Sequence, residues 1–188
     1  GTERLAEAIT LMELAEDTIV VNVQGDEPEI PPALIDALAS CLASDPECPM
    51  ATAVHPVQSV ADWLNPNVVK VVADAEDRAL LFSRAPLPWS RSHLAWGLDA
   101  GTPQARQAFE AAQPLRHIGM YAYRSRFLTR YAQLAPCALE DIEALEQLRV
   151  LHHGYRIKLL HTDDAPPAGV DTPADLERVR ARLGHGTH

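Results

Sequence analysis

The sequence predicts a three-layer α/β fold in which helices cover both faces of a mixed, mostly parallel β-sheet. Residues 3–15 place apolar side chains at helical spacing, and the β-branched run at 18–23 follows as a buried strand. The same succession returns later, where a helix at 138–154 precedes a strand at 156–162. Runs with the spacing of antiparallel strands lie between these two units, so we expect one mixed sheet.

Size and composition indicate a single globular domain over residues 1–188, because 47% of the residues are hydrophobic. The formal net charge of -10 leaves no basic surface for nucleic acid. Three cysteines without metal-site spacing indicate reduced thiols, and no apolar run approaches the roughly 20 residues that span a bilayer. We therefore expect a cytoplasmic protein with neither a nucleic-acid nor a membrane partner.

The first half of the chain supplies a helix, a strand and a hairpin. Pro31 and Pro32 open a helix that extends to about residue 42, and residues 50–57 are typical of a strand. After a turn, the apolar runs 68–73 and 79–83 are close enough in sequence to pair as a hairpin.

The second half begins with an irregular Pro-rich excursion at 84–115, which we interpret as a lid or a dimer contact containing a short helix at 104–112. Residues 117–123 then alternate strictly as a strand. One predicted face of it carries Ile118, Met120 and Ala122, and the other carries His117, Tyr121 and Tyr123. A helix at 125–135 and a final helix capped by Thr172 complete the expected elements.

Asp26 follows directly after the first strand, behind Gln24 and Gly25. Ligands of open α/β sheets sit at the carboxyl ends of strands, and a carboxylate there suits Mg²⁺ bridging to phosphate oxygens. Asp171 stands at a second loop-to-helix junction, where it could complete the same site. A solvated turn explains Asp26 equally well, and an N-terminal cap explains Asp171.

Some of the other polar residues also have two interpretations. Arg84 ends a strand and suits a carboxylate ligand, but a surface arginine fits the pattern equally well. His117 and Tyr121 either bind sugar hydroxyls or a carboxylate, or are satisfied by neighbouring groups. Glu146 and Gln147 fit the polar surface of a helix. Lys70 alternates with valines and is expected to face solvent.

Seven segments together resemble a known family. They are GTERL at 1–5, VNVQGDEP at 21–28, NPNVVKVV at 65–72, FSRA at 82–85, HIGMY at 117–121, LEQLR at 145–149 and GVDTP at 169–173. In combination they resemble the 3-deoxy-manno-octulosonate cytidylyltransferases, almost from end to end.

The resemblance implies a nucleotide-diphospho-sugar transferase fold and the reaction of CTP with 3-deoxy-manno-octulosonate (Kdo) to give CMP-Kdo and pyrophosphate for lipopolysaccharide biosynthesis. It implies Mg²⁺ as the cofactor and a homodimer as the assembly. The implied metal ligands are Asp26 and Asp171. The implied Kdo contacts are Arg84, His117, Tyr121, Glu146 and Gln147, and the implied nucleotide contacts are Thr2, Arg4 and Gln24.

Two departures from the family accompany the resemblance. The family begins with a strand and a basic triphosphate-binding loop, and no segment of this sequence corresponds to them, so we expect an upstream segment to be missing. Residues 91–115 are longer than in typical members. Two alternatives stay open: a cytidylyltransferase for another acid sugar such as sialic acid, and a non-catalytic nucleotide-sugar binding module.

Overall fold

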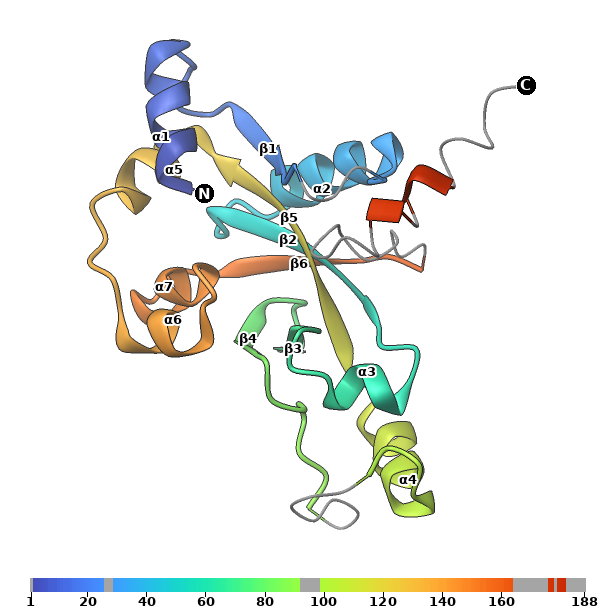
Figure 1. Ribbon diagram of the computed structural model, residues 1–188. Helices are drawn as coiled ribbons and strands as arrows, with labels where there is room; N and C mark the ends of the chain where they lie inside the picture. Colours follow the sequence, from blue (N-terminus) through green and yellow to red (C-terminus); the bar gives the residue numbers. More distant parts are fainter. Residues whose placement is uncertain (1, 26–28, 92–98, 164–175, 178, 182–188) are drawn as a thin grey trace.

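The computed structural model describes residues 2–25, 29–91, 99–163, 176–177 and 179–181. Six strands of this part of the chain form one mixed sheet, and helices lie on both of its faces (Figure 1). The predicted three-layer α/β architecture is therefore confirmed.

Most elements begin and end within a few residues of the predicted bounds. The helices are α1 (Thr2–Leu11), α2 (Pro32–Ser44), α3 (Val60–Leu64), α4 (Pro103–Ala112), α5 (Ser125–Tyr131), α6 (Ala138–Glu143) and α7 (Gln147–His152). The strands are β1 (Ile19–Val23), β2 (Met50–Pro56), β3 (Lys70–Ala73), β4 (Ala79–Ser83), β5 (Leu115–Arg124) and β6 (Ile157–His161). The β3–β4 hairpin is confirmed, whereas α3 was not predicted.

The long strand β5 is the centre of the sheet. β2 pairs along one edge of β5, while β1 and β3 share the other edge, β1 beside residues 120–124 and β3 beside residues 115–116. All three neighbours run antiparallel to β5, and only the β2–β6 pair among the described strands is parallel. The expectation of a mostly parallel sheet is therefore wrong. β1 and β2, which α2 connects, do run in the same direction. They are not neighbours, however, because β5 lies between them.

Each face of the sheet has its own apolar core, as the alternation in β5 predicts. On one face, Leu38 and Leu42 of α2 pack in the cluster that contains Ile118 and Met120. On the other face, Tyr121 belongs to the core formed with α1, α5 and α7. β5 is therefore covered on both sides, and the side chains of His117, Tyr121 and Tyr123 lie inside the protein rather than on its surface.

The Pro-rich excursion contains the predicted short helix, α4. Thr102 caps this helix by accepting a hydrogen bond from Ala105 N at 3.2 Å. Trp63 of α3 is fully buried against Phe109 and donates from its indole nitrogen to Leu87 O at 2.9 Å. A small third core thus joins α3 and α4 to the segment that leaves β4 (Figure 1).

The single helix expected at 138–154 is wrong, because the structure has two short helices there. α6 ends at Glu143, the next residue Ala144 has left-handed dihedral angles (φ 51°, ψ 52°), and α7 begins at Gln147. The apolar residue Ile142, on the α6 side of this break, is 81% exposed. The break also removes Glu146 and Gln147 from the helical surface on which the sequence placed them.

The C-terminal part is described only in short pieces. Residues 176–177 and 179–181 are helical, and the predicted cap Thr172 lies outside the described residues. None of the helices that the structure describes is both long and apolar enough to cross a membrane.

Candidate functional site

A cavity of about 700 Å³ opens where four segments meet: the start of α1, the end of β1, the middle of β5 and the break between α6 and α7. Its size is in the range typical of small-molecule sites. Its lining includes Arg4, Gln24, His117, Tyr121, Glu146 and Gln147. Six of the ten residues that the sequence singled out are thus brought together, although they lie up to 143 positions apart.

His117 and Tyr121 form the wall that β5 contributes. Their ring centroids are 5.3 Å apart, and Phe82 packs edge-on against His117 at 5.1 Å. Burial, assisted by the neighbouring charge of Arg116, lowers the pKa of His117 to about 3. Burial likewise raises the pKa of Tyr121 well above its usual value. Both rings are therefore neutral hydrogen-bonding groups at physiological pH.

The first turn of α1 holds the carboxylate of Glu146 in place. Thr2 Oγ1 donates to Glu146 Oε1 at 3.0 Å, and the Thr2 backbone N–H donates to Oε2 at 3.5 Å. Thr2 Oγ1 also lies 3.3 Å from the hydroxyl of Tyr123. Thr2 itself is buried and does not line the cavity, so the structure places it as a support for Glu146.

The amide of Gln147 is incompletely satisfied. The residue is only 2% exposed, and its Nε2 is buried with no hydrogen-bond partner among the described residues. An unpaired buried amide donor is costly, and such groups in native proteins often mark the place of a ligand. Because Gln147 lines the cavity, its free donor suits an acceptor oxygen on a bound molecule.

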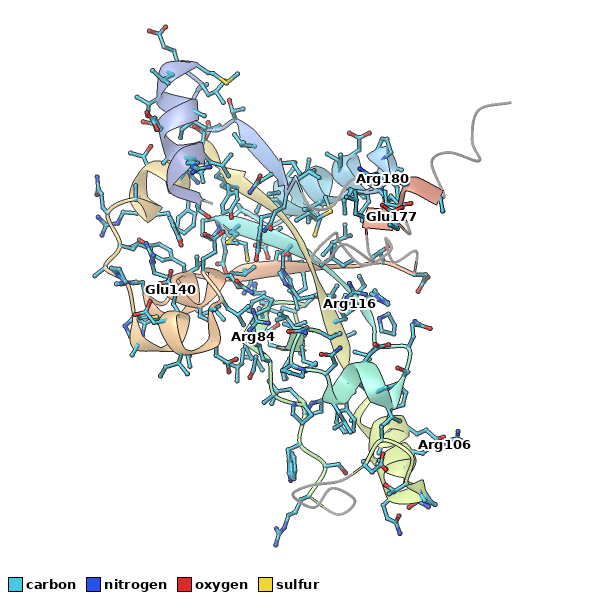
Figure 2. All side chains as sticks on the ribbon, viewed as in Figure 1. Arg84, Arg106, Arg116, Glu140, Glu177 and Arg180 are labelled. Carbon is cyan, nitrogen blue, oxygen red and sulfur yellow. The ribbon has the colours of Figure 1, made fainter. Side chains whose placement is uncertain are left out.

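Arg84 lies beside the cavity and does not line it. Its Nε donates to Glu143 O at 2.7 Å and its Nη1 to Pro66 O at 3.0 Å, while its backbone N–H donates to the Glu143 carboxylate at 2.9 Å. Figure 2 shows Arg84 between β4 and the α6–α7 pair. In this structure the guanidinium holds the backbone at the end of α6.

Lys70 is fully buried, so the expectation that it faces solvent is wrong. Its ammonium group donates to three carbonyl oxygens: Asn65 O at 2.8 Å, Val68 O at 2.6 Å and Arg84 O at 2.7 Å. Burial, together with the nearby positive charge of Arg84, lowers the pKa of Lys70 to about 8. Lys70 and its neighbour Val71 belong to opposite faces of β3, and both are buried, which the residue pattern of this strand alone does not reveal.

Asp26 and Asp171 lie outside the described residues. The described chain does reach Gln24 and Gly25, so the cavity borders the segment that leads into Asp26. Within the described ranges, no group of three or more His, Cys, Asp or Glu side chains is positioned to hold a metal ion. The predicted metal pair stays a prediction.

Asn22 lines the cavity although sequence reasoning did not select it. The sequence does contain an indication of this role, because Asn22 is the single polar residue in the apolar strand Ile19–Val23. With Gln24 it gives this edge of the cavity two amide side chains. Together with a carboxylate, a phenol, an imidazole and Arg4, these groups suit a ligand rich in hydroxyl and anionic oxygens.

Residues 1–157 match the model of a protein family described as cytidylyltransferase. The chain belongs to the cytidylyltransferase family. It is 58% identical over 183 residues to the 3-deoxy-manno-octulosonate cytidylyltransferase of Methylibium petroleiphilum, covering 97% of this chain and 67% of that protein.

A solved member supports the same assignment. The structure of a CMP:2-keto-3-deoxy-manno-octonic acid synthetase complexed with CTP superposes with a TM-score of 0.82 at 38% identity, covering 99% of this chain and 68% of that one. Family membership therefore confirms the predicted resemblance and the class of enzyme, a nucleotidyltransferase. The chain spans about two thirds of the length of both relatives.

Proposed function

We propose that this protein transfers CMP from CTP to Kdo, giving CMP-Kdo and pyrophosphate. The observation that supports this most directly is the single cavity in which Arg4, Gln24, His117, Tyr121, Glu146 and Gln147 meet. The resemblance assigned the first two of these residues to the nucleotide and the other four to Kdo. The 58% identity to a protein named for this reaction supports the same substrates.

The reaction would proceed by attack of the anomeric hydroxyl oxygen of Kdo on the α-phosphorus of CTP. A P–O bond forms to the sugar, and the bond to the β-phosphate breaks to release pyrophosphate. The protein forms no covalent bond to the substrate in such a transfer, so catalysis depends on positioning the reactants and on stabilising charge.

The side chains of the cavity fit this positioning role. Tyr121 and the Gln147 amide are neutral donors for sugar oxygens, and Glu146, tied to Thr2, accepts from sugar hydroxyls without reorienting. Arg4 is the permanent cation among the described lining residues, and it lies at the start of α1, where the positive end of the helix dipole also favours phosphate.

A divalent cation is part of the proposal. Asp26 and Asp171 are the side chains expected to hold Mg²⁺, because carboxylate oxygens are ligands of that hard ion. When bound, the ion would neutralise the charge that develops on the phosphate oxygens. The role of these two carboxylates would be to hold the ion in place.

The proposal also includes the expected homodimer, with 84–115 as its contact or as a lid, a place in lipopolysaccharide biosynthesis and a location in the cytoplasm. Trp89 of this excursion is 41% exposed, which suits a residue that a second subunit covers. Light scattering at several protein concentrations would measure the assembly state.

The test of function is product formation by the full-length protein. Incubation with CTP, Mg²⁺ and either Kdo or N-acetylneuraminate, followed by mass detection of the products, separates the acid-sugar alternatives. We expect CMP-Kdo and stoichiometric pyrophosphate with Kdo alone. Product only with N-acetylneuraminate would overturn the choice of sugar, and binding without pyrophosphate release would favour a binding module.

A further inference from the structure

The pairing of β2 with β5 is interrupted next to the cavity. Thr52 lies opposite Tyr121, but the next residue, Ala53, lies opposite Ile118, so Gly119 and Met120 have no partner in β2. Such irregularities re-aim side chains and are frequent beside active sites. Here the interruption brings the side chain of Thr52 against β5 at the position of His117.

The hydroxyl of Thr52 makes three contacts but has one proton. Thr52 Oγ1 lies 2.7 Å from Met120 O, 3.2 Å from Ile118 O and 2.9 Å from Nε2 of His117, and the residue is fully buried. Carbonyl oxygens only accept hydrogen bonds, so an O···O distance of 2.7 Å requires the hydroxyl proton to point at a carbonyl. Thr52 therefore offers His117 a lone pair.

This contact determines where the ring of His117 carries its proton. A neutral imidazole has one N–H, and the Thr52 lone pair requires that N–H to be on Nε2. The ring cannot turn freely, because Phe82 and Tyr121 both pack against it. Nδ1 is left unprotonated and has no hydrogen-bond partner among the described residues.

We infer that Thr52 is a positioning residue that holds His117 in the Nε2–H tautomer, so that Nδ1 presents a hydrogen-bond acceptor to the ligand. His117 then binds a hydroxyl group of the substrate and not a carboxylate, which has no proton to donate. The sequence left open whether His117 binds a sugar hydroxyl or a carboxylate, and this tautomer selects the hydroxyl. The identity of the ligand as a sugar rests on the proposed function, whereas the tautomer does not.

A bound substrate hydroxyl becomes a specificity element under this arrangement. A site built around a fixed acceptor discriminates against an analogue that lacks the hydroxyl, because the acceptor is then buried without a partner. Kdo analogues in which one hydroxyl is replaced by hydrogen identify the position read by His117. We expect one such analogue to lose affinity by about 10-fold or more.

The tautomer is measured in the ligand-free, full-length protein by long-range ¹H–¹⁵N correlation spectra of the histidine side chains. The His117 signals are assigned by their disappearance in His117→Gln. We expect the pattern of a neutral ring protonated at Nε2. An Nδ1–H ring or an imidazolium at pH 7 would overturn the inference, whatever sugar the enzyme uses.

Two substitutions test the role of Thr52. Thr52→Val keeps the branched shape but removes the lone pair, so we expect a second, Nδ1-protonated population of His117 and a loss of Kdo affinity of about 10-fold. Thr52→Ser keeps the hydroxyl and should retain both the wild-type spectrum and an affinity within about 3-fold. Circular dichroism verifies folding of each variant. A folded Thr52→Val protein with unchanged tautomer and affinity would show that Thr52 has no positioning role.

Discussion

Replacement of Gln147 by methionine should stabilise the free protein and lower its affinity for the ligand. The Nε2 group of Gln147 is buried without a partner, and the side chain is 2% exposed. Leaving an amide donor unsatisfied costs about 1–3 kcal/mol. Methionine has a similar length and no polar donor, so Gln147→Met removes this cost. We expect the free energy of unfolding to rise by about 1 kcal/mol, because part of the gain is lost to imperfect packing.

The same substitution removes a donor that the bound ligand would use. An acceptor oxygen of Kdo then loses its hydrogen bond inside a closed site, and about 1–3 kcal/mol of binding free energy corresponds to a 5-fold to 150-fold weaker dissociation constant. Urea unfolding measures the first effect, and titration calorimetry with Kdo measures the second. Opposite signs in the two experiments are the signature of a group that is retained for function at the expense of stability.

Gln107→Met is the matched control, because Gln107 is exposed on α4, away from the cavity. Its unfolding free energy should stay within about 0.5 kcal/mol of the wild-type value, and its Kdo affinity should not change. The reasoning fails if Gln147→Met is less stable than the wild type and binds Kdo normally. That result would mean that the Gln147 amide is satisfied within the protein.

Further substitutions probe the break between α6 and α7, the buried lysine and the predicted metal pair. Ala144 has left-handed dihedral angles, so Ala144→Gly should raise the unfolding free energy by up to about 1 kcal/mol and Ala144→Val should lower it by more than that, as measured in urea. The pKa of Lys70 is about 8 in the folded protein against 10.5 when unperturbed, so the unfolded chain binds more protons between these values. Wild-type stability should therefore rise with pH across that window relative to Lys70→Met, by on the order of 2 kcal/mol, and a fall would contradict the assignment. Asp26→Asn or Asp171→Asn should each reduce turnover of the full-length protein at least about 100-fold while leaving its thermal midpoint unchanged, and a normal rate in either variant would refute the metal pair.

The sequence predicted the elements whose signals are local. The apolar run that ends before Gly25, the hairpin at 68–83 and the short helix expected at 104–112 all lie where residue patterns placed them. Each depends on spacing or on a capping residue within a few positions. The alternation in β5 also assigned its side chains to the correct two faces.

The features that the sequence did not reveal depend on distant partners. Ala144 adopts a conformation that glycine usually signals, so the break in the predicted helix at 138–154 left no mark in the residues themselves. Lys70 is buried, and its ammonium group binds carbonyl oxygens of the loop before β3 and of Arg84, which follows β4. The antiparallel insertion of β5 likewise reflects the order of strands in space. The cavity residues were selected by resemblance, and only the fold brings them together.

The carbonyl groups around Lys70 connect the β3–β4 hairpin to the rim of the cavity. One of these oxygens belongs to Arg84, whose side chain donates a hydrogen bond to the backbone carbonyl oxygen of Glu143. The rim that carries Glu146 and Gln147 is therefore ordered before any substrate arrives. An incoming sugar does not have to freeze a loose segment, so more of its contact energy is available for affinity and for orientation of the attacking oxygen.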